Sequence, residues 1–203
     1  MAYSLENCQF LNTDYVGLDT SYPSTIASPN NRYLIAVRNC FFSGRSMRNS
    51  NTASLGSLGY FIRTCAGSIT IENSTFESLY RGILMGSSGG QGLEDVKNVK
   101  IRSSTFDQID STAITGHGVQ STIIVDNQFY GVCQGSSTLV SDAAVYLDYQ
   151  SDGNIVSGNQ FGMDAIAPAP RFYIVLQPAG TPFLKIPTGN CITNNSFLRA
   201  TAG

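Results

Sequence analysis

A six-residue pattern of apolar and polar positions recurs seven times along the chain. Each copy begins with an aliphatic residue, has Cys, Ser or Asn at its fourth position and ends with Phe. The closing residues are Phe10, Phe42, Phe76, Phe106, Phe129, Phe161 and Phe197, separated by 32, 34, 30, 23, 32 and 36 residues. Self-similarity at this period indicates a repeat architecture in which each repeat packs only on its neighbours.

The repeats predict strands and no helices. In the middle copies, apolar residues alternate with polar ones, as in Ile69-Thr70-Ile71, which is typical of a strand with one buried face. A second apolar segment follows most copies, at 59–62, 82–85, 113–115, 144–147 and 172–176. Short strands in repeats of about 31 residues predict an all-β parallel β-helix of about seven rungs. We expect residues 1–203 to form one such domain, as a segment of a larger protein or assembly.

One column of exposed charges supports this register. The residue after the aliphatic reads Glu6, Arg38, Glu72 and Arg102 in the first four copies. Equivalent residues of successive rungs lie at the spacing of parallel strands, about 4.8 Å, so opposite charges would attract along the column. The fourth position reads Cys, Cys, Ser, Ser, Asn, Asn, Asn, and we expect its inward Asn side chains to hydrogen-bond neighbouring backbone. Its cysteines are expected to remain thiols, since parallel neighbours seldom have disulfide geometry.

Composition excludes several functions. Only 13% of the 203 residues are charged, the net charge is −2 and there are three lysines, so we expect no nucleic-acid binding. The apolar runs are too short to cross a bilayer, so we expect no membrane partner, and the first ten residues show no signal peptide. Five cysteines without paired spacing and a single histidine predict neither a metal site nor a cofactor.

The repeat resembles a known fold family. The segment Ile69–Phe76 reads I-x-I-x-N-S-x-F and is followed by the strand Gly82-Ile83-Leu84-Met85. This combination looks like the right-handed parallel β-helix of the pectin-lyase-like superfamily, and its Ser, Thr, Asn and Gly content is similar to that of bacteriophage tailspikes and virion appendages. The resemblance covers residues 3–197. It is specific for the fold and not for the function, because this fold hosts lyases, hydrolases, epimerases and non-enzymatic stalks.

Two carboxylates on adjacent rungs are the best candidates for chemistry. Glu77 and Asp107 each follow a motif Phe, so we expect them about 5 Å apart, near the separation of a retaining glycosidase pair. Asp110 lies near Asp107 and is a third catalytic candidate. The candidate substrate-binding residues are Tyr80, Arg81 and Tyr130, which offer aromatic surfaces and a cation beside the carboxylates. The alternative is that these are ordinary solvated turn positions of a polar repeat.

Other motifs are weaker. Asn12-Thr13-Asp14 and Gly116-His117-Gly118 resemble two polygalacturonase motifs but lie about three rungs apart, so we interpret His117 as a turn residue between glycines. Asp142, Asp148 and Asp152 form the densest acidic group but have no matching base, which leaves a metal site unsupported. The inserts at 21–31, 44–58, 86–95, 131–142 and 177–190 are candidate binding walls or contacts to a neighbouring subunit.

The resemblance implies a function and an assembly. We expect a structural and receptor-binding domain of a phage tailspike or other virion appendage that binds host surface polysaccharide. The alternatives are a polysaccharide depolymerase, either a hydrolase or a lyase, and a bacterial surface adhesin on the same fold. Solenoid ends need capping, so the expected partners are two further copies in a homotrimer and other virion proteins. The expected location is the virion, outside the cell.

Overall fold

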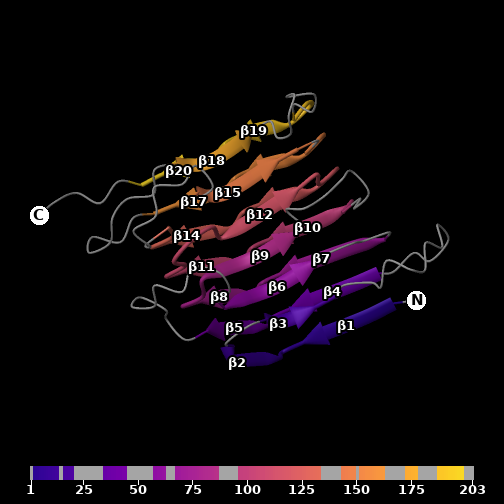
Figure 1. The fold of residues 1–203 in the computed structure, drawn as a ribbon, viewed down its shortest axis with the longest axis vertical. Helices are drawn as coiled ribbons and strands as arrows, with labels where there is room; N and C mark the ends of the chain where they lie inside the picture. Colours follow the sequence, from indigo (N-terminus) through magenta and orange to yellow (C-terminus); the bar gives the residue numbers. More distant parts are fainter. Residues whose placement is uncertain are drawn as a thin grey trace, which may run out of the picture.

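The chain folds as a parallel β-helix whose rungs stack along one axis (Figure 1). The computed structural model describes residues 2–13, 16–20, 34–44, 57–62, 67–86, 96–133, 143–149, 151–162, 172–177 and 187–198. These residues contain strands and no helix. No helix that could span a bilayer is therefore found among them.

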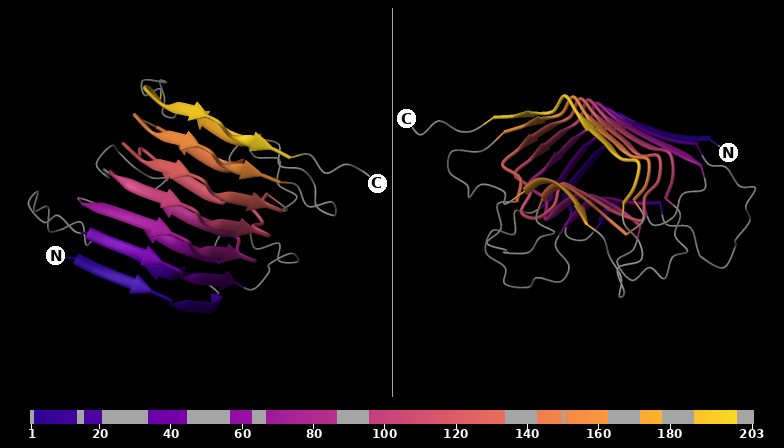
Figure 2. Two further views of the ribbon diagram at one scale, coloured as in Figure 1. Left: turned by 180° about the vertical axis from the view of Figure 1, so that it is seen from behind. Right: turned by 90° about the horizontal axis from the view of Figure 1, so that it is seen from above.

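Three parallel sheets run along the stack, and the rungs superpose when viewed from above (Figure 2). The first sheet contains β1 (Ala2–Glu6), β4 (Leu34–Arg38), β7 (Ser68–Glu72), β10 (Val99–Arg102), β13 (Ile123–Val125), β16 (Ile155–Ser157) and β19 (Cys191–Thr193). The second contains β2 (Gln9–Thr13), β5 (Phe41–Gly44), β8 (Thr75–Glu77), β11 (Thr105–Asp107), β14 (Gln128–Tyr130), β17 (Gln160–Phe161) and β20 (Ser196–Phe197). The third contains β3 (Val16–Asp19), β6 (Leu58–Ile62), β9 (Arg81–Met85), β12 (Ile114–His117), β15 (Ala143–Asp148) and β18 (Phe172–Gln177).

This architecture confirms the β-helix of about seven rungs that the repeats predict. The first two residues of each six-residue copy end a strand of the first sheet, and its last two residues lie in a strand of the second sheet. Phe76, Phe106 and Phe129 are direct partners in the register of the second sheet. The five apolar segments that follow the copies are β6, β9, β12, β15 and β18 of the third sheet.

The turn between the first and second sheets depends on one left-handed residue in every rung. Its φ angle lies between 50° and 67° at Asn7, Asn39, Asn73, Ser103, Asp126, Gly158 and Asn194. Asn and Asp tolerate this region better than most residues, and Gly adopts it without a steric penalty. This single left-handed residue bends the chain between the two strands. The side chain of the polar residue that follows it then points into the interior.

That polar side chain forms a hydrogen-bonded column through the stack. In each step, a backbone N–H donates to the side-chain oxygen of the next rung. The donor–acceptor pairs are Cys40–Ser74 (3.2 Å), Ser74–Ser104 (3.2 Å), Ser104–Asn127 (3.0 Å), Asn127–Asn159 (3.0 Å) and Asn159–Asn195 (3.0 Å). The asparagine side chains also donate to backbone carbonyls of the preceding rung. Asn159 Nδ2, for example, donates to the carbonyl of Ile124 at 2.9 Å. The expected inward Asn hydrogen bonds are therefore present.

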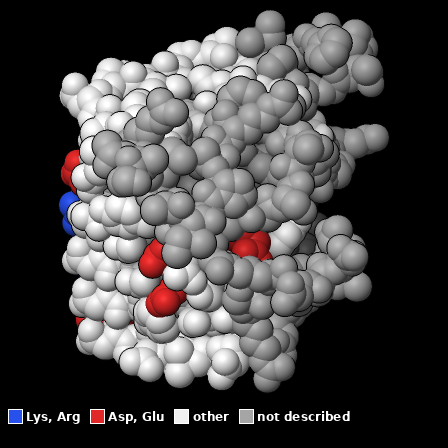
Figure 3. Space-filling model, turned by 90° about the vertical axis from the view of Figure 1, so that its left-hand side faces the viewer, with Lys and Arg blue, Asp and Glu red and all other residues white. Residues whose placement is uncertain are grey.

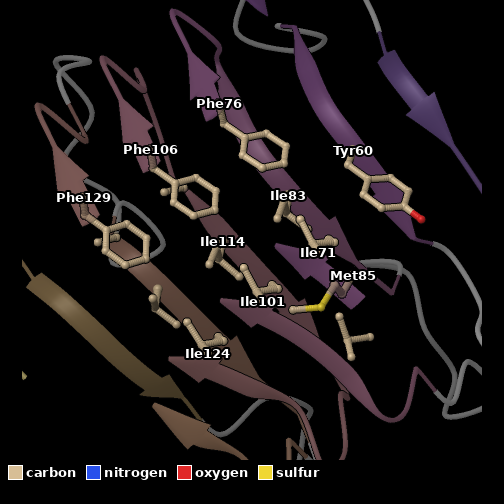
Figure 4. Packing of buried hydrophobic residues seen from close by; sticks show 14 of the residues in the cluster. Tyr60, Ile71, Phe76, Ile83, Met85, Ile101, Phe106, Ile114, Ile124 and Phe129 are labelled. Carbon is tan, nitrogen blue, oxygen red and sulfur yellow. The ribbon is translucent and has the colours of Figure 1, made fainter. Parts of the chain in front are cut away.

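A stack of phenylalanine rings projects from the second sheet into the interior, where Phe76 and Phe106 lie beside glycines of the third sheet. The seven motif rings lie in one column, with neighbouring centroids 4.6–5.2 Å apart and interplanar angles of at most 11°. Figure 4 shows Phe76, Phe106 and Phe129 in this column, beside the aliphatic side chains of the first and third sheets. The five rings from Phe42 to Phe161 are fully buried. Burial of this apolar surface is the main driving force for the stack.

The predicted charge column is present on the first sheet. Glu6, Arg38, Glu72 and Arg102 are partners in register. Arg38 Nε donates to Glu72 Oε1 at 2.7 Å, and Arg102 Nε donates to Glu72 Oε2 at 2.7 Å. Hydrogen bonds from Arg102 and Arg38 hold the pKa of Glu72 below its usual value of 4.5. Glu72 is therefore the centre of an ion-pair network rather than a solvated surface group.

The described cysteines, Cys8, Cys40, Cys133 and Cys191, are all thiols. Cys8 and Cys40 occupy equivalent positions in the first two rungs, where the sequence predicts thiols. Burial raises the pKa of Cys40, which favours its neutral thiol. Cys65 lies outside the described residues.

Candidate functional site

The outer face of the second sheet brings three of the six predicted site residues together. Side chains alternate along a strand, so the residues on either side of a buried Phe point outward. Glu77 of β8 is the register partner of Asp107 of β11, and Asp107 is the partner of Tyr130 of β14. All three residues are partly exposed. This column is called here the carboxylate–tyrosine column.

The two carboxylates lie where the sequence places them, on adjacent rungs. Direct partners in a parallel sheet lie about 4.8 Å apart along the hydrogen-bonding direction. A retaining glycosidase needs two carboxyl groups about 5–5.5 Å apart, one as nucleophile and one as acid and base. The backbone register of Glu77 and Asp107 is compatible with that arrangement.

Tyr130 is held in place by the following rung. Its hydroxyl donates to Oε1 of Gln160 at 3.1 Å. A Cβ atom placed on Gly162 would lie 2.6 Å from Cδ1 of the tyrosine ring, so the ring occupies space that only a glycine leaves open. The aromatic surface beside the carboxylates is therefore fixed before any ligand arrives.

Tyr80, Arg81 and Asp110 lie at the corner between the second and third sheets. The guanidinium carbon of Arg81 is 5.4 Å from the centroid of the Tyr80 ring, a cation–π contact. The amide of Asp110 donates to the carbonyl of Leu79, and that of Ser111 donates to the carbonyl of Tyr80, which places Asp110 beside Tyr80 on the next rung. Arg81 Nε is buried without a hydrogen-bond partner in the described part of the chain.

A few acidic side chains are visible on this side of the molecule. Figure 3 shows them as separate red groups in the lower half of a mostly uncharged face, while the basic side chains in view lie at one edge. Outward side chains beside the column are hydroxyl and amide groups, with Thr75 opposite Thr105 and Gln128 opposite Gln160. Such a face offers hydrogen bonds to sugar hydroxyls and repels dense polyanions.

His117 is the main correction to the sequence interpretation. It is the last residue of strand β12 and not a turn residue. Its register partner is Asp148 of β15, and its Nδ1 lies 2.7 Å from Asp148 Oδ1. Aligning Ile114 with Val145 at the start of the third-sheet segments would have revealed this pairing, because His117 and Asp148 each lie three residues further on.

The other acidic candidates form no metal site in the part of the chain that the structure describes. Among the residues that the structure describes, no three His, Cys, Asp or Glu residues gather as metal ligands. Asp152 accepts hydrogen bonds from the amide and hydroxyl of Thr188, at 2.7 and 3.0 Å. Asp14, Asp142 and most residues of the five inserts lie outside the described residues.

Comparison with protein-family models, curated proteins and solved structures finds no match to this chain. Its geometry is therefore the basis for assigning a function. That geometry consists of the β-helix, the carboxylate–tyrosine column with its neighbouring corner, and the His117–Asp148 pair on the third sheet.

Proposed function

We propose that this chain is the β-helix domain of a bacteriophage tailspike or related virion appendage of the pectin-lyase-like type, and that it binds host surface polysaccharide. The carboxylate–tyrosine column carries the proposal. It combines a fixed aromatic ring with two carboxylates, and hydroxyl and amide groups lie beside it along the same face. A linear polymer of sugars presents apolar ring faces and hydroxyl groups that such a surface can bind.

The chemistry of the face favours one class of glycan. Glu77 and Asp107 stand beside each other, and Arg81 already stacks on Tyr80. A densely anionic polymer would be repelled by the two carboxylates. The preferred ligand is therefore a polysaccharide of neutral or amino sugars, whose hydroxyl or ammonium groups donate to the carboxylates.

The proposal includes a homotrimer on the virion, in contact with other virion proteins. The supporting feature is the set of large apolar side chains exposed on the terminal rungs, such as Leu11, Phe197 and Leu198, each between 46% and 57% exposed. Exposed apolar groups of this kind are commonly covered in an assembly.

A depolymerase is the second candidate function, because Glu77 and Asp107 are direct register partners. In that case one carboxyl group protonates the leaving sugar oxygen and the other attacks the anomeric carbon. Replacing Glu77 with Gln, or Asp107 with Asn, would abolish the release of reducing ends, whereas Tyr130 would still offer its ring to the glycan.

Glycan binding can be tested with purified capsular and O-antigen polysaccharides and titration calorimetry. We expect Tyr130→Ala to weaken binding about tenfold, because the stacking surface is lost. The Tyr130→Phe variant keeps the ring and loses only the hydroxyl contact with Gln160, so it should bind nearly as well as the wild type. Equal binding by all three proteins would remove the column from the proposal.

A further inference from the structure

A second polar cluster lies on the third sheet, at the carboxyl ends of three neighbouring strands. His117 of β12, Asp148 of β15 and Gln177 of β18 are consecutive partners in register. The His117 and Asp148 side chains are 12% and 7% exposed, and Nδ1 and Oδ1 are 2.7 Å apart. A titratable pair is thus held in a largely buried position, although apolar side chains of similar size would be less costly there.

The cluster fixes the imidazole in one orientation. Asp148 occupies Nδ1, so Nε2 is the nitrogen left to exchange a proton with a ligand. The rings of Tyr146 and Tyr149 meet the imidazole nearly edge-on, with centroids 6.4 and 6.1 Å away. A histidine oriented by a buried carboxylate is the arrangement that makes imidazole an effective general base.

Tyr146 adds a neutral donor to the cluster. Its hydroxyl donates to Oε1 of Gln177 at 2.9 Å. Burial, with a smaller contribution from the charge of Asp148, raises the pKa of Tyr146 to about 12, so it remains a phenol at neutral pH. The only formal negative charge among these contacts is that of Asp148, which disfavours an anionic ligand.

The backbone on the two sides of His117 differs in its surroundings. Among the described residues, a Cβ atom placed on Gly118 would meet no heavy atom within 4 Å, whereas one placed on Gly86 would lie 2.4 Å from the carbonyl oxygen of His117. The His117 side chain itself keeps 12% of its surface exposed, so the imidazole is not wholly enclosed in the core.

We propose that His117 and Asp148 form a hydrolytic site for neutral carboxylic esters, with His117 as the catalytic base and Asp148 as its positioning residue. Nε2 takes a proton from water as the water oxygen bonds to the acyl carbon. The ester C–O bond then breaks, and the imidazolium returns the proton to the departing alcohol oxygen. The products are one carboxylic acid and one alcohol, and no other reactant is needed.

The ester class follows from the surroundings. Two tyrosine rings and the Gln177 amide suit a neutral, hydroxyl-bearing alcohol portion. An O-acetylated sugar has that chemistry. This choice of sugar esters rests on the proposed glycan function, whereas ester hydrolysis itself does not.

The test measures ester hydrolysis by the full chain, with p-nitrophenyl acetate and with O-acetylated xylan as probes. Because His117 is the single histidine, free imidazole at equal concentration is the reference for its intrinsic reactivity. We expect the protein to exceed imidazole by about tenfold or more. The rate should rise with pH through a single ionisation, a readout that a purely structural pair would not produce.

Three variants assign the roles. His117→Gln should reduce the rate at least about tenfold, and Asp148→Asn should lower it and shift the pH profile. Asp152→Asn is the matched control, because the hydrogen bonds described for the Asp152 side chain are with Thr188, and this variant should hydrolyse esters as the wild type does.

The outcomes separate this proposal from glycan binding. A wild-type rate no greater than that of imidazole would overturn the hydrolytic site, whether or not the variants fold. If His117→Gln unfolds, the Asp148→Asn variant and the wild-type pH profile still test the hydrolytic site. An unchanged rate in folded Asp148→Asn would contradict the positioning role of Asp148. A wild-type chain that hydrolyses p-nitrophenyl acetate and binds no polysaccharide would contradict glycan binding alone, and a chain that binds polysaccharide and hydrolyses no ester would contradict the hydrolytic site alone.

Discussion

At the scale of single residues, each interior position is defined by its equivalents in the rungs above and below. Phe106 lies between Phe76 and Phe129, with both centroid separations 4.9 Å. The polar column obeys the same rule, because the Asn127 amide is satisfied by Asn159 of the next rung. An interior side chain in this fold therefore packs mainly against the equivalent side chains of the neighbouring rungs.

Truncating one ring tests this rule. Phe106→Ala should lower the free energy of unfolding by about 3–5 kcal/mol, because it opens a cavity in the middle of the stack. Phe197→Ala is the matched control in the same column, since its ring is 53% exposed and its loss should cost much less. Chemical denaturation monitored by circular dichroism would measure both. Equal losses in the two variants would contradict the stacked core.

At the scale of strands, the sequence predicts two sheets better than the third. The first and second sheets are linked by the fixed six-residue pattern, so their register and the charge column could be read directly. The third-sheet residues Tyr60, Ile83, Ile114, Val145 and Ile174 are in register, yet they follow their motif Phe by 18, 7, 8, 16 and 13 residues. These variable connections obscure the alignment.

The candidate sites follow the same division. Glu77, Asp107 and Tyr130 could be predicted as neighbours because each directly follows its motif Phe. His117 and Asp148 belong to the third sheet, where no fixed offset from the motif exists. The physical reason is that the corner between the second and third sheets accommodates inserts without disturbing strand pairing.

The charge column of the first sheet gives a prediction for an element. Arg38→Glu places three carboxylates in adjacent register positions, Glu6, residue 38 and Glu72, and should lower the midpoint of thermal unfolding. The loss should shrink as salt rises from 0.01 to 1 M, where the Debye length falls from about 30 to 3 Å. Lys100→Glu is the control, because its register partners Thr70 and Ile123 are uncharged. A salt-independent loss in Arg38→Glu would contradict the electrostatic explanation.

At the scale of the whole molecule, the interior side chains of the middle rungs are covered by rungs on both sides, whereas those of the terminal rungs are covered on one side. The rings from Phe42 to Phe161 are fully buried, whereas Phe197 is half exposed. In a stack with nearest-neighbour contacts, a terminal rung gains stability from only one side. The terminal rungs are therefore the least protected part of the described structure.

The proposed assembly can be measured by light scattering coupled to size exclusion. Three copies of the 21.8 kDa chain give a particle of about 65 kDa, and we expect that mass if the homotrimer forms. A species at 21.8 kDa over a wide concentration range would reject the trimer and direct the search for glycan contacts to a single chain.

The constant link between the first and second sheets has an evolutionary consequence. Every copy of the pattern places its Phe five residues after its aliphatic, whatever the length of the inserts. A tandem duplication or a deletion of one whole repeat, such as the 23 residues from Asp107 to Phe129, leaves equivalent residues as neighbours in both sheets. Recombination within such a gene can therefore change the number of repeats and still encode interior side chains that pack on their equivalents. The length of the β-helix can then evolve separately from its loops.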